Sequence, residues 1–402
     1  MSDVKLFCTK CNKEFSADKV HILCDVCNEA LEVETIKRGK ICDGNALEQS
    51  IMERYREFYP FLPIDKDTSL GEGFTPLVES KKLAEELGVR KLYFKNETQN
   101  PTWSFKDRGT LTGVLHAIKL GYKKIGTVST GNMAVSVAAY GSKANLETFI
   151  FVKKTMASEK LNPVAIYGPH LIKVDGDYGN LYFESLKIGK ENDIYFINSD
   201  VPFRVEGYKT LAYEICEQLN FEIPDYVVVP TSAGGNIRGI EKGFEEFKNS
   251  GYIDKVPKMI CAQASGCSPI DRAYHNDEEN ISRFENPNTI AHAIENPFPP
   301  SGNQVLRKLR QKDGVFISVS DEEIVKAQDI LAREGIFAQP ASAVPLAAVK
   351  KLKEENKLNG DEKIACVVTG SGLKYTAAFE KHDLKSKECK LEELGNFIAK
   401  NY

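Results

Sequence analysis

The stretch that decides the fold reads Asn100-Pro101-Thr102-Trp103-Ser104-Phe105-Lys106-Asp107-Arg108-Gly109. It follows a short apolar run, Lys91-Leu92-Tyr93-Phe94, that predicts a buried strand. The proline and the small hydroxyl residues indicate a turn, and Ser104 is expected to cap a helix after it. Lys106 would then lie in the first helical turn at the carboxyl end of a strand, where α/β sheets open onto ligand crevices. Burial and the helix dipole disfavour a charge there, and a neutral amine is what a Schiff base requires. The alternative is a charged helix start that lies exposed on the surface.

A second segment repeats the pattern of strand, turn and helix. It reads Val128-Ser129-Thr130-Gly131-Asn132-Met133-Ala134-Val135-Ser136, in which small polar residues follow an apolar strand. Donors at such a turn, at the start of a helix, can hold an anionic group. Taken alone, the segment could be only a tight turn.

A third segment carries two adjacent glycines after a strand. It reads Val229-Pro230-Thr231-Ser232-Ala233-Gly234-Gly235-Asn236-Ile237-Arg238-Gly239. Adjacent glycines let backbone N–H groups converge on a phosphate without obstruction from side chains. The segment matches neither the Walker pattern nor the dinucleotide fingerprint, which argues against ATP and NAD. A plain helix-starting turn is the alternative.

A fourth segment ends a buried strand with a threonine. In Cys366-Val367-Val368-Thr369-Gly370-Ser371-Gly372 the apolar run stops at Thr369. A hydroxyl at that place can meet a heteroaromatic nitrogen as donor or acceptor. A threonine that caps a turn is the simpler interpretation of this segment by itself.

Apolar β-branched runs alternate with amphipathic stretches from about residue 70 onward. Runs without polar alternation are typical of strands buried on both faces, as in parallel sheets covered by helices. They predict an α/β fold with more strands than one doubly wound sheet holds. The runs are Lys91–Phe94, Ile125–Val128, Thr148–Val152, Tyr226–Val229, Met259–Ala262 and Ile364–Val368.

Four of the ten cysteines form two Cys-x-x-Cys pairs near the N-terminus. Cys8 and Cys11 make the first pair, Cys24 and Cys27 the second, with twelve residues between the inner cysteines. Each pair can turn two sulfurs toward one point, so the spacing predicts a four-thiolate zinc ribbon. The alternative is a flexible tail with free thiols. Acidic residues offset the basic ones around the ribbon, which favours a scaffold over a nucleic-acid reader.

The composition fits an enzyme of ordinary size. The 402 residues carry 53 Lys plus Arg against 57 Asp plus Glu, a net charge of −4 at pH 7, and we expect no nucleic-acid partner. No apolar stretch is long enough to span a membrane, and the first residues lack the pattern of a signal peptide. We therefore expect a cytoplasmic protein that binds no membrane. The length predicts two or three domains.

In this order, the four segments resemble the β-family, or fold type II, of pyridoxal 5'-phosphate (PLP) enzymes, and most closely the threonine synthase family. The resemblance covers residues from about 70 to about 380, and its lysine string is highly specific. It also includes Gly71–Leu77, Phe203–Thr210 and Glu334–Ala343. It implies a two-domain, tryptophan synthase β-like α/β fold with parallel-rich sheets flanked by helices. The expected domains are a zinc ribbon over 1–36, a large PLP-binding domain over 37–99 and 206–402, and a small inserted domain over 100–205.

The resemblance assigns the cofactor contacts. It implies that Lys106 holds PLP as a Schiff base, that Asn132 hydrogen-bonds the phenolic oxygen, and that backbone amides of 232–236 cradle the phosphate. Thr369 would face the pyridine nitrogen and leave it largely unprotonated. The implied cofactor-binding residues are Phe105, Lys106, Asn132, Ser232, Ala233, Gly234, Gly235, Asn236 and Thr369.

The reaction implied by the resemblance converts O-phospho-L-homoserine and water to L-threonine and phosphate. Lys106 would be the catalytic residue, and its freed amine would remove the α-proton and later a β-proton. Arg204 is the strongest candidate for the substrate phosphate because its planar fork matches phosphate oxygens. The alternative is an exposed surface arginine that contributes little. The relatives also imply a homodimer. The implied substrate-binding residues are Ser129, Asn198, Ser199, Arg204 and Lys209.

Several residues depart from the family's pattern near the expected substrate. Met133 stands where a threonine is common, Ala233 in a region that usually carries an asparagine, and Gln339 where an acid is usual. The cofactor assignment stands, but a PLP-dependent β-elimination or β-replacement on serine, threonine or phosphoserine stays open. Threonine dehydratase, cysteine synthase and cysteate synthase are examples. An alternative of another class is a non-catalytic zinc-ribbon protein that binds a ligand.

Overall fold

Three sheets organise the part of the chain that the computed structural model describes, which is residues 4–45, 48–156, 161–176, 178–375, 382 and 386–401. The first is a small antiparallel sheet in the order β2-β1-β3, and it forms the N-terminal ribbon. Its strands are β1 (Lys5–Cys8), β2 (Glu14–Ser16) and β3 (Leu31–Val33).

The largest sheet has six strands in the order β12-β11-β10-β13-β5-β4. Neighbouring strands pair in parallel, except that β4 runs antiparallel to β5 at the edge. The carboxyl ends of β10, β13 and β5 therefore meet at one edge of the sheet, which is where such folds bind ligands. The strands are β4 (Leu77–Glu79), β5 (Lys91–Asn96), β10 (Tyr226–Pro230), β11 (Lys258–Ala264), β12 (Val315–Val319) and β13 (Lys363–Val368).

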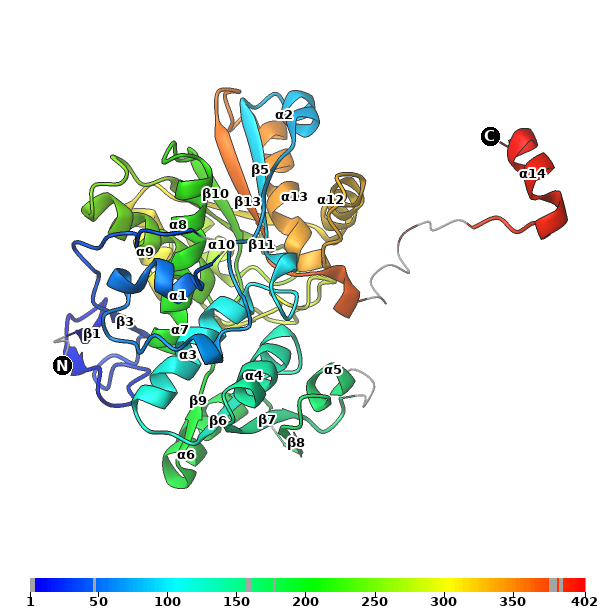
Figure 1. The fold of residues 1–402 in the computed structure, drawn as a ribbon. Coiled ribbons are helices and arrows are strands. Elements are labelled where there is room, and N and C mark those ends of the chain that lie inside the picture. The colour runs from blue at the N-terminus through cyan, green and yellow to red at the C-terminus, as the bar shows by residue number, and fades with distance from the viewer. Residues whose placement is uncertain are drawn as a thin grey trace.

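A separate sheet of four parallel strands has the order β8-β7-β6-β9. It lies below the larger sheet in Figure 1. Its strands are β6 (Lys124–Val128), β7 (Glu147–Lys153), β8 (His170–Val174) and β9 (Ile194–Phe196). Each of the six predicted apolar runs falls within a strand, and the α/β prediction with more than one parallel-rich sheet is confirmed.

Helices cover both faces of the six-stranded sheet, as successive residues of β10 illustrate. Val228 packs in one core cluster with residues of α13, whereas Val227 and Val229 pack in the other with Ile237 of α9. All three valines are buried, which explains why the strand lacks polar alternation. The helices are α1 (Ile51–Arg54), α2 (Lys81–Leu87), α3 (Lys106–Lys119), α4 (Asn132–Lys143), α5 (Asn162–Ala165), α6 (Tyr178–Asn192), α7 (Pro202–Gly207), α8 (Lys209–Gln218), α9 (Gly235–Asn249), α10 (Pro269–His275), α11 (Gly302–Gln311), α12 (Asp321–Arg333), α13 (Pro340–Glu354) and α14 (Leu394–Asn401).

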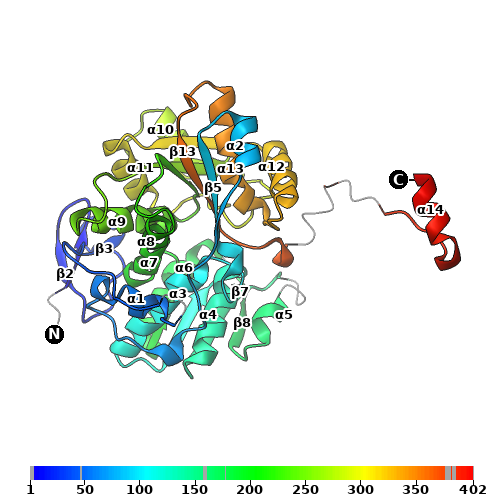
Figure 2. The same ribbon diagram turned by 45° about the horizontal axis from the view of Figure 1, so that its top comes forward.

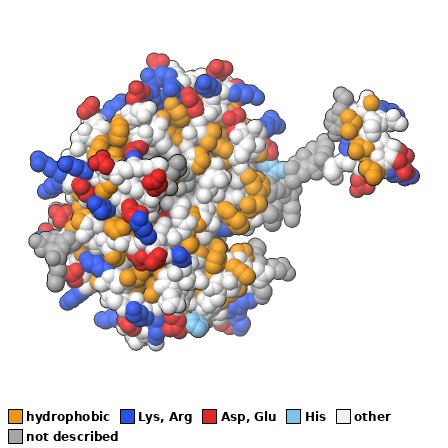
Figure 3. Space-filling view, viewed as in Figure 1, with side chains coloured by type: hydrophobic (Ala, Val, Ile, Leu, Met, Phe, Trp, Pro, Cys, Tyr) orange, Lys and Arg blue, Asp and Glu red, His pale blue; other side chains and the backbone are white. Residues whose placement is uncertain are grey.

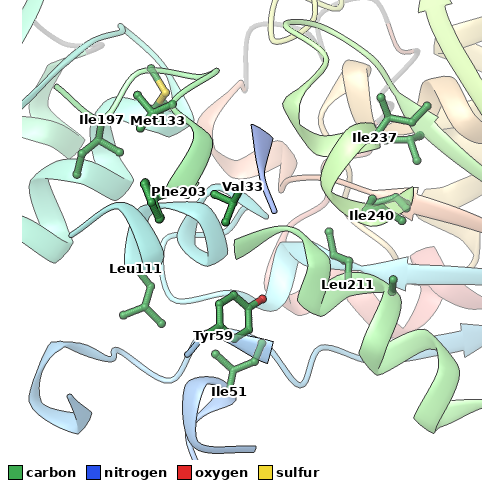
Figure 4. Close-up of a cluster of buried hydrophobic side chains, with 14 of the residues drawn as sticks. Val33, Ile51, Tyr59, Leu111, Met133, Ile197, Phe203, Leu211, Ile237 and Ile240 are labelled. Atoms are coloured by element: carbon green, nitrogen blue, oxygen red, sulfur yellow. The ribbon is translucent and has the colours of Figure 1, made fainter. Parts of the chain in front are cut away.

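One apolar core joins the ribbon to the rest of the molecule. Val33 of β3 belongs to the same buried cluster as Ile237 and Ile240 of α9, and Figure 4 draws these residues together. The cluster also includes Met133 of α4 and Phe203 of α7. The ribbon is therefore packed into the body of the protein and does not hang from it as a separate module.

The surface is mixed in charge, and the C-terminal helix lies apart from the body. Figure 3 shows positive and negative side chains interspersed over the visible face. Helix α14 lies away from the three sheets in both ribbon views (Figures 1 and 2). Among the described residues, no helix has the length and apolar character needed to cross a membrane.

Candidate active site

The turn that carries Lys106 is fixed to the end of strand β13. The N–H of Phe105 donates to the carbonyl of Thr369 over 3.0 Å, and the N–H of Ser371 donates to the carbonyl of Trp103 over 3.0 Å. Helix α3 begins at Lys106 with Phe105 as its N-cap, and no side chain caps it. The prediction that Ser104 caps this helix is wrong, because Ser104 pairs through its backbone with Gly370 and its buried hydroxyl has no partner.

The two residues after Lys106 anchor the start of α3. The Asp107 carboxylate accepts hydrogen bonds from the backbone N–H and the hydroxyl of Thr102, at 2.7 and 2.5 Å. The Arg108 guanidinium is fully buried and forms ion pairs of 2.6 Å with both Glu97 and Glu214. The charged residues of the lysine string thus hold the turn in place, and the alternative of an exposed charged helix start does not apply to them.

Lys106 itself lies where a positive charge is disfavoured. Burial is the larger cause and the nearby charge of Arg204 the smaller, and together they lower the pKa of Lys106 to about 7. Its Nζ lies 4.4 Å from the centre of the Phe105 ring. A large fraction of the amine is therefore neutral at physiological pH, which is the state that attacks a carbonyl carbon.

The turn after strand β10 forms a cradle of backbone amides, which we call the phosphate cradle and define as residues 232–236. Gly234 has φ +96° and caps α9, and a side chain on Gly235 would approach the carbonyl oxygen of Ser199 to 2.8 Å. The amide oxygen and nitrogen of Asn236 are buried without a hydrogen-bond partner. Free N–H groups at the start of a helix and unsatisfied polar atoms beside them suit a phosphate group.

The other two polar contacts predicted for the cofactor face the same space. The Nδ2 of Asn132 donates to Oε1 of Gln339 over 3.1 Å, and the Oδ1 of Asn132 is buried without a partner. The Thr369 hydroxyl lies 2.9 Å from that of Ser342. Ser342 donates its one hydroxyl hydrogen to the carbonyl of Gly370 over 3.0 Å, so the Thr369 hydroxyl donates to Ser342 and its oxygen stays an acceptor for a group in the pocket.

A single pocket is lined by these elements. All nine predicted cofactor-binding residues line it, together with Ser199 from the predicted substrate set. Residues that reasoning from the sequence missed also line it, among them Tyr208, Ala293, Ile294 and Gln339. Tyr208 lies inside the Phe203–Thr210 motif, and Gln339 stands where the family usually has an acid, so the sequence offered a reason to select both. Ala293 and Ile294 are apolar residues in an irregular loop, and nothing in the sequence marks them as pocket residues.

The other four predicted substrate residues, Ser129, Asn198, Arg204 and Lys209, are not among the residues that line this pocket. Arg204 is fully buried, donates to the Tyr208 hydroxyl over 3.0 Å and to the Thr110 hydroxyl over 3.2 Å, and keeps its Nη2 without a partner. Its positive charge is one cause of the lowered pKa of Lys106. The alternative of an exposed surface arginine does not hold, and an unpartnered guanidinium nitrogen in such a place suits an anionic ligand.

Ser129 and Asn198 shape the turn before helix α4. The Ser129 hydroxyl accepts from the Gly131 N–H over 3.3 Å. The Asn198 side chain accepts from the Val128 N–H over 3.1 Å and donates to the Ser185 hydroxyl over 3.1 Å. Asn198 is buried and satisfied by these contacts, so its observed position is that of a brace behind the turn.

Lys209 is not brought to the pocket. Its ammonium is buried between Glu206 at 2.6 Å and Glu246 at 3.0 Å, and it donates to the carbonyl of Phe58 over 3.1 Å. Burial acts against its charge, but the two carboxylates outweigh it and raise the pKa of Lys209. The structure thus accounts for this lysine as part of a buried ion-pair cluster.

The four ribbon cysteines converge as their spacing predicts. Their sulfur atoms all lie within 4.8 Å of one another, with Cys8 and Cys27 at 3.3 Å, Cys11 and Cys24 at 3.6 Å, and Cys11 and Cys27 at 3.9 Å. Four sulfurs at about 2.3 Å from a tetrahedral zinc ion are about 3.8 Å apart. The arrangement therefore fits a metal of this kind.

Comparison with known families agrees with the fold and the pocket. Residues 68–370 match the family model described as pyridoxal-phosphate dependent enzyme. Solved structures with a similar fold include maize serine racemase (TM-score 0.64, 24% identity, 81% of this chain and 92% of that one). A threonine deaminase from Solanum lycopersicum has a TM-score of 0.66 at 22% identity, over 87% of this chain and 98% of that one. The chain belongs to the pyridoxal-phosphate dependent enzymes of fold type II.

Curated relatives narrow the family further. The threonine synthase of Methanocaldococcus jannaschii is 42% identical over 91% of this chain and 92% of its own length. That of Methanosarcina acetivorans is 37% identical over 92% of each chain. Within its class, the chain is a member of the threonine synthase family.

Proposed function

We propose that the chain converts O-phospho-L-homoserine and water to L-threonine and inorganic phosphate, with PLP bound at Lys106. The observation that carries the proposal is that Lys106, whose pKa is lowered to about 7, lines the same pocket as the phosphate cradle and Thr369. Membership in the threonine synthase family supports the substrate.

The residues of the pocket suit the cofactor at each of its polar groups. The phosphate cradle would hold the phosphate, the amide of Asn132 the phenolic oxygen, and the hydroxyl of Thr369 the ring nitrogen. When bound, PLP supplies an electron sink conjugated to the substrate's α-carbon. The orphaned Nδ2 of Asn236 supports this fit at the phosphate, because buried polar atoms in native proteins normally have partners.

The chain's own residues then divide the remaining work. The amine of Lys106 takes the α-proton and later a β-proton, since it is a basic group that lines the pocket. The unpartnered Nη2 of Arg204 would donate to the substrate phosphate as that group leaves the γ-carbon. Ser199 lines the pocket and can donate to the same oxygens. The protons taken by the amine are returned, one to the γ-carbon after phosphate has left and one to the α-carbon at the end, and water adds at the β-carbon to give the hydroxyl of threonine.

Phosphate release from O-phospho-L-homoserine, together with threonine formation, tests the proposal directly. We expect the wild-type protein to form both products in equal amounts and Lys106→Ala to lose ~10²- to 10⁴-fold or more of the rate, the usual weight of a proton-transfer group. The Lys106→Ala protein should also lose the visible absorption of the covalently held cofactor. Equal turnover by both proteins would refute the proposal.

A second candidate reaction is β-elimination from phosphoserine, serine or threonine by the same lysine. Met133 favours it, because this residue lies buried at the second position of α4 and its thioether cannot donate a hydrogen bond to a phosphate. Assays of these three amino acids beside O-phospho-L-homoserine decide between the two reactions. A protein that binds PLP and an amino acid but turns over none of them would be a ligand-binding protein instead.

We further propose a structural zinc ion at Cys8, Cys11, Cys24 and Cys27, and the domain borders expected above. The convergence of the four sulfurs supports the metal, and the two separate parallel sheets support a small domain within 100–205. A homodimer in the cytoplasm follows the resemblance and the cysteine usage, since none of the described cysteines forms a disulfide. Metal analysis and light scattering of the purified protein test these points.

A further inference from the structure

The third strand of the ribbon lies against the helix that begins with the phosphate cradle. All three residues of β3 are buried. Two cations on α9, one helical turn apart, bind alternate carbonyl groups of this strand. Arg238 donates to the carbonyl of Leu31 over 3.1 Å, and Lys242 donates to that of Val33 over 2.5 Å. Any shift of β3 would therefore be transmitted to α9, whose first residues are Gly235 and Asn236.

Arg238 also connects the ribbon to the cradle through a second route. Its Nη1 donates to the hydroxyl of Ser301 over 2.7 Å, and the N–H of Ser301 donates to the carbonyl of Ala233 over 3.1 Å. Arg238 and Ser301 are both buried, so water cannot easily replace these bonds. Three hydrogen bonds thus join Leu31 in the ribbon to Ala233 in the cradle.

Helix α11 holds the ribbon and supports the cradle from the same side. Glu32 of β3 accepts from Gln304 over 2.7 Å and pairs with Lys308 at 3.0 Å. A side chain on Gly234 would approach Cγ2 of Val305, in the same helix, to 2.8 Å. The phosphate cradle therefore packs against α11, the same helix whose polar side chains bind Glu32 of the ribbon.

We propose that the ribbon is an internal support for the phosphate cradle, so that metal binding at the four cysteines and PLP binding at residues 232–236 strengthen each other through Glu32, Arg238 and Ser301. The inference rests on the proposed function, because it takes the cradle as the site of the cofactor phosphate. In this proposal the ribbon acts on helices α9 and α11 of its own chain.

The test measures PLP affinity, by absorbance and fluorescence titration, in zinc-loaded full-length protein and in protein stripped with a chelator. We expect stripping to weaken PLP binding by ~5- to 150-fold, the usual range of coupling between sites, and PLP to tighten zinc binding by the same factor because linkage is reciprocal. Circular dichroism checks that the stripped protein stays folded. Equal PLP affinity in both folded forms would overturn the proposal.

Variants of the zinc-loaded protein keep the test decisive if stripping unfolds it. Glu32→Gln and Ser301→Ala should each weaken PLP binding and lower the mutual effect of zinc and PLP. Glu14→Gln is the matched control, since Glu14 lies exposed in the same ribbon and its ion pair, with Lys5 at 2.6 Å, is also exposed. PLP binding unchanged in Glu32→Gln and Ser301→Ala contradicts the coupling alone, whereas a protein that binds no PLP in any form contradicts the proposed function as well.

Discussion

The Nδ2 of Asn132 donates a 3.1 Å hydrogen bond to Oε1 of Gln339, joining the first residue of α4 to the residue that caps α13. Both side chains line the pocket. Because one hydrogen of the Asn132 amide is committed to Gln339, the other is held in a fixed direction, and we expect it to meet the phenolic oxygen of PLP.

Replacing Gln339 tests this positioning role. Gln339→Leu removes the acceptor, so the Asn132 amide is no longer held toward the phenolic oxygen. If the contact with PLP is lost, we expect roughly 5- to 150-fold weaker PLP binding, which corresponds to about 1–3 kcal/mol for a buried hydrogen bond. Gln339→Glu keeps an acceptor oxygen and should bind PLP close to the wild-type value. Titration of each apoprotein with PLP measures the effect, and a leucine variant with wild-type affinity would contradict it.

The charge of Arg204 should lower further the pH at which Lys106 reacts, beyond the larger effect of burial. Burial and Arg204 lower the pKa of Lys106 to about 7, so the neutral fraction, and with it the rate of covalent PLP attachment, should rise with pH and level off above about 7. Arg204→Gln removes a positive neighbour, raises the pKa of Lys106 and moves this inflection to higher pH. Arg204→Lys keeps the charge and should leave the inflection in place. Rapid-mixing absorbance across pH gives the profile, and identical profiles for the glutamine and lysine variants would sink the idea.

Alanine substitutions at two glycines with positive φ distinguish the effect of backbone strain from the effect of a side chain placed in the phosphate cradle. Gly234 (φ +96°) and Gly251 (φ +80°) should each lose about 1 kcal/mol of stability on change to alanine. Only Gly234→Ala also pushes a methyl group toward Val305 and Ser301, at 2.8 and 3.0 Å, whereas the space at Gly251 is open. We therefore expect weak PLP binding in Gly234→Ala and ordinary binding in Gly251→Ala, as measured by titration and thermal unfolding.

The buried ion pairs behind Lys106 should make stability depend on acid. Glu214 pairs with Lys95 and Arg108 at 2.6 Å each, and these cations outweigh the effect of burial and lower the pKa of Glu214 to about 2. A depressed carboxyl pKa stabilises the fold above the unfolded value of about 4.3, and that contribution is lost as pH falls from there toward 2.

Substitution of Glu214 checks the size of this contribution. Glu214→Gln leaves two buried cations short of a partner and should cost about 3–5 kcal/mol at neutral pH. Glu86→Gln, which breaks an exposed pair with Lys82, should cost less than about 1 kcal/mol. Urea unfolding at several pH values measures both, and a loss in Glu214→Gln no larger than in Glu86→Gln would count against the network.

The strands and the cofactor residues could be predicted because their signals are local. Val227, Val228 and Val229 are apolar because both faces of β10 are covered, and this shows in the sequence as a run without alternation. The adjacent glycines of the phosphate cradle predict a turn in which side chains would obstruct the backbone N–H groups. In each case the residues that the structure requires are adjacent in the sequence, so a short segment is enough to predict them.

The roles of Ser104 and Lys209 depended on contacts that no local pattern contains. Lys209 follows Arg204 in one motif, but α7 ends at Gly207 and α8 starts at Lys209, so the two cations face different surroundings. Glu246 on α9 then takes Lys209 as its partner. Ser104 does not cap the helix because its backbone pairs with Gly370, which follows β13 and lies far along the chain.

The burial of β3 has a consequence for how the protein is made. The ribbon leaves the ribosome before the helix that holds it, since Arg238, which binds the carbonyl of Leu31, follows 207 positions later. At the usual pace of about 5–20 residues per second, the ribbon waits roughly 10 to 40 s for that partner. The four cysteines all lie within residues 8–27, so they are available to bind a metal ion early in synthesis. Metal binding can therefore fold the ribbon before α9 is made and covers its apolar residues.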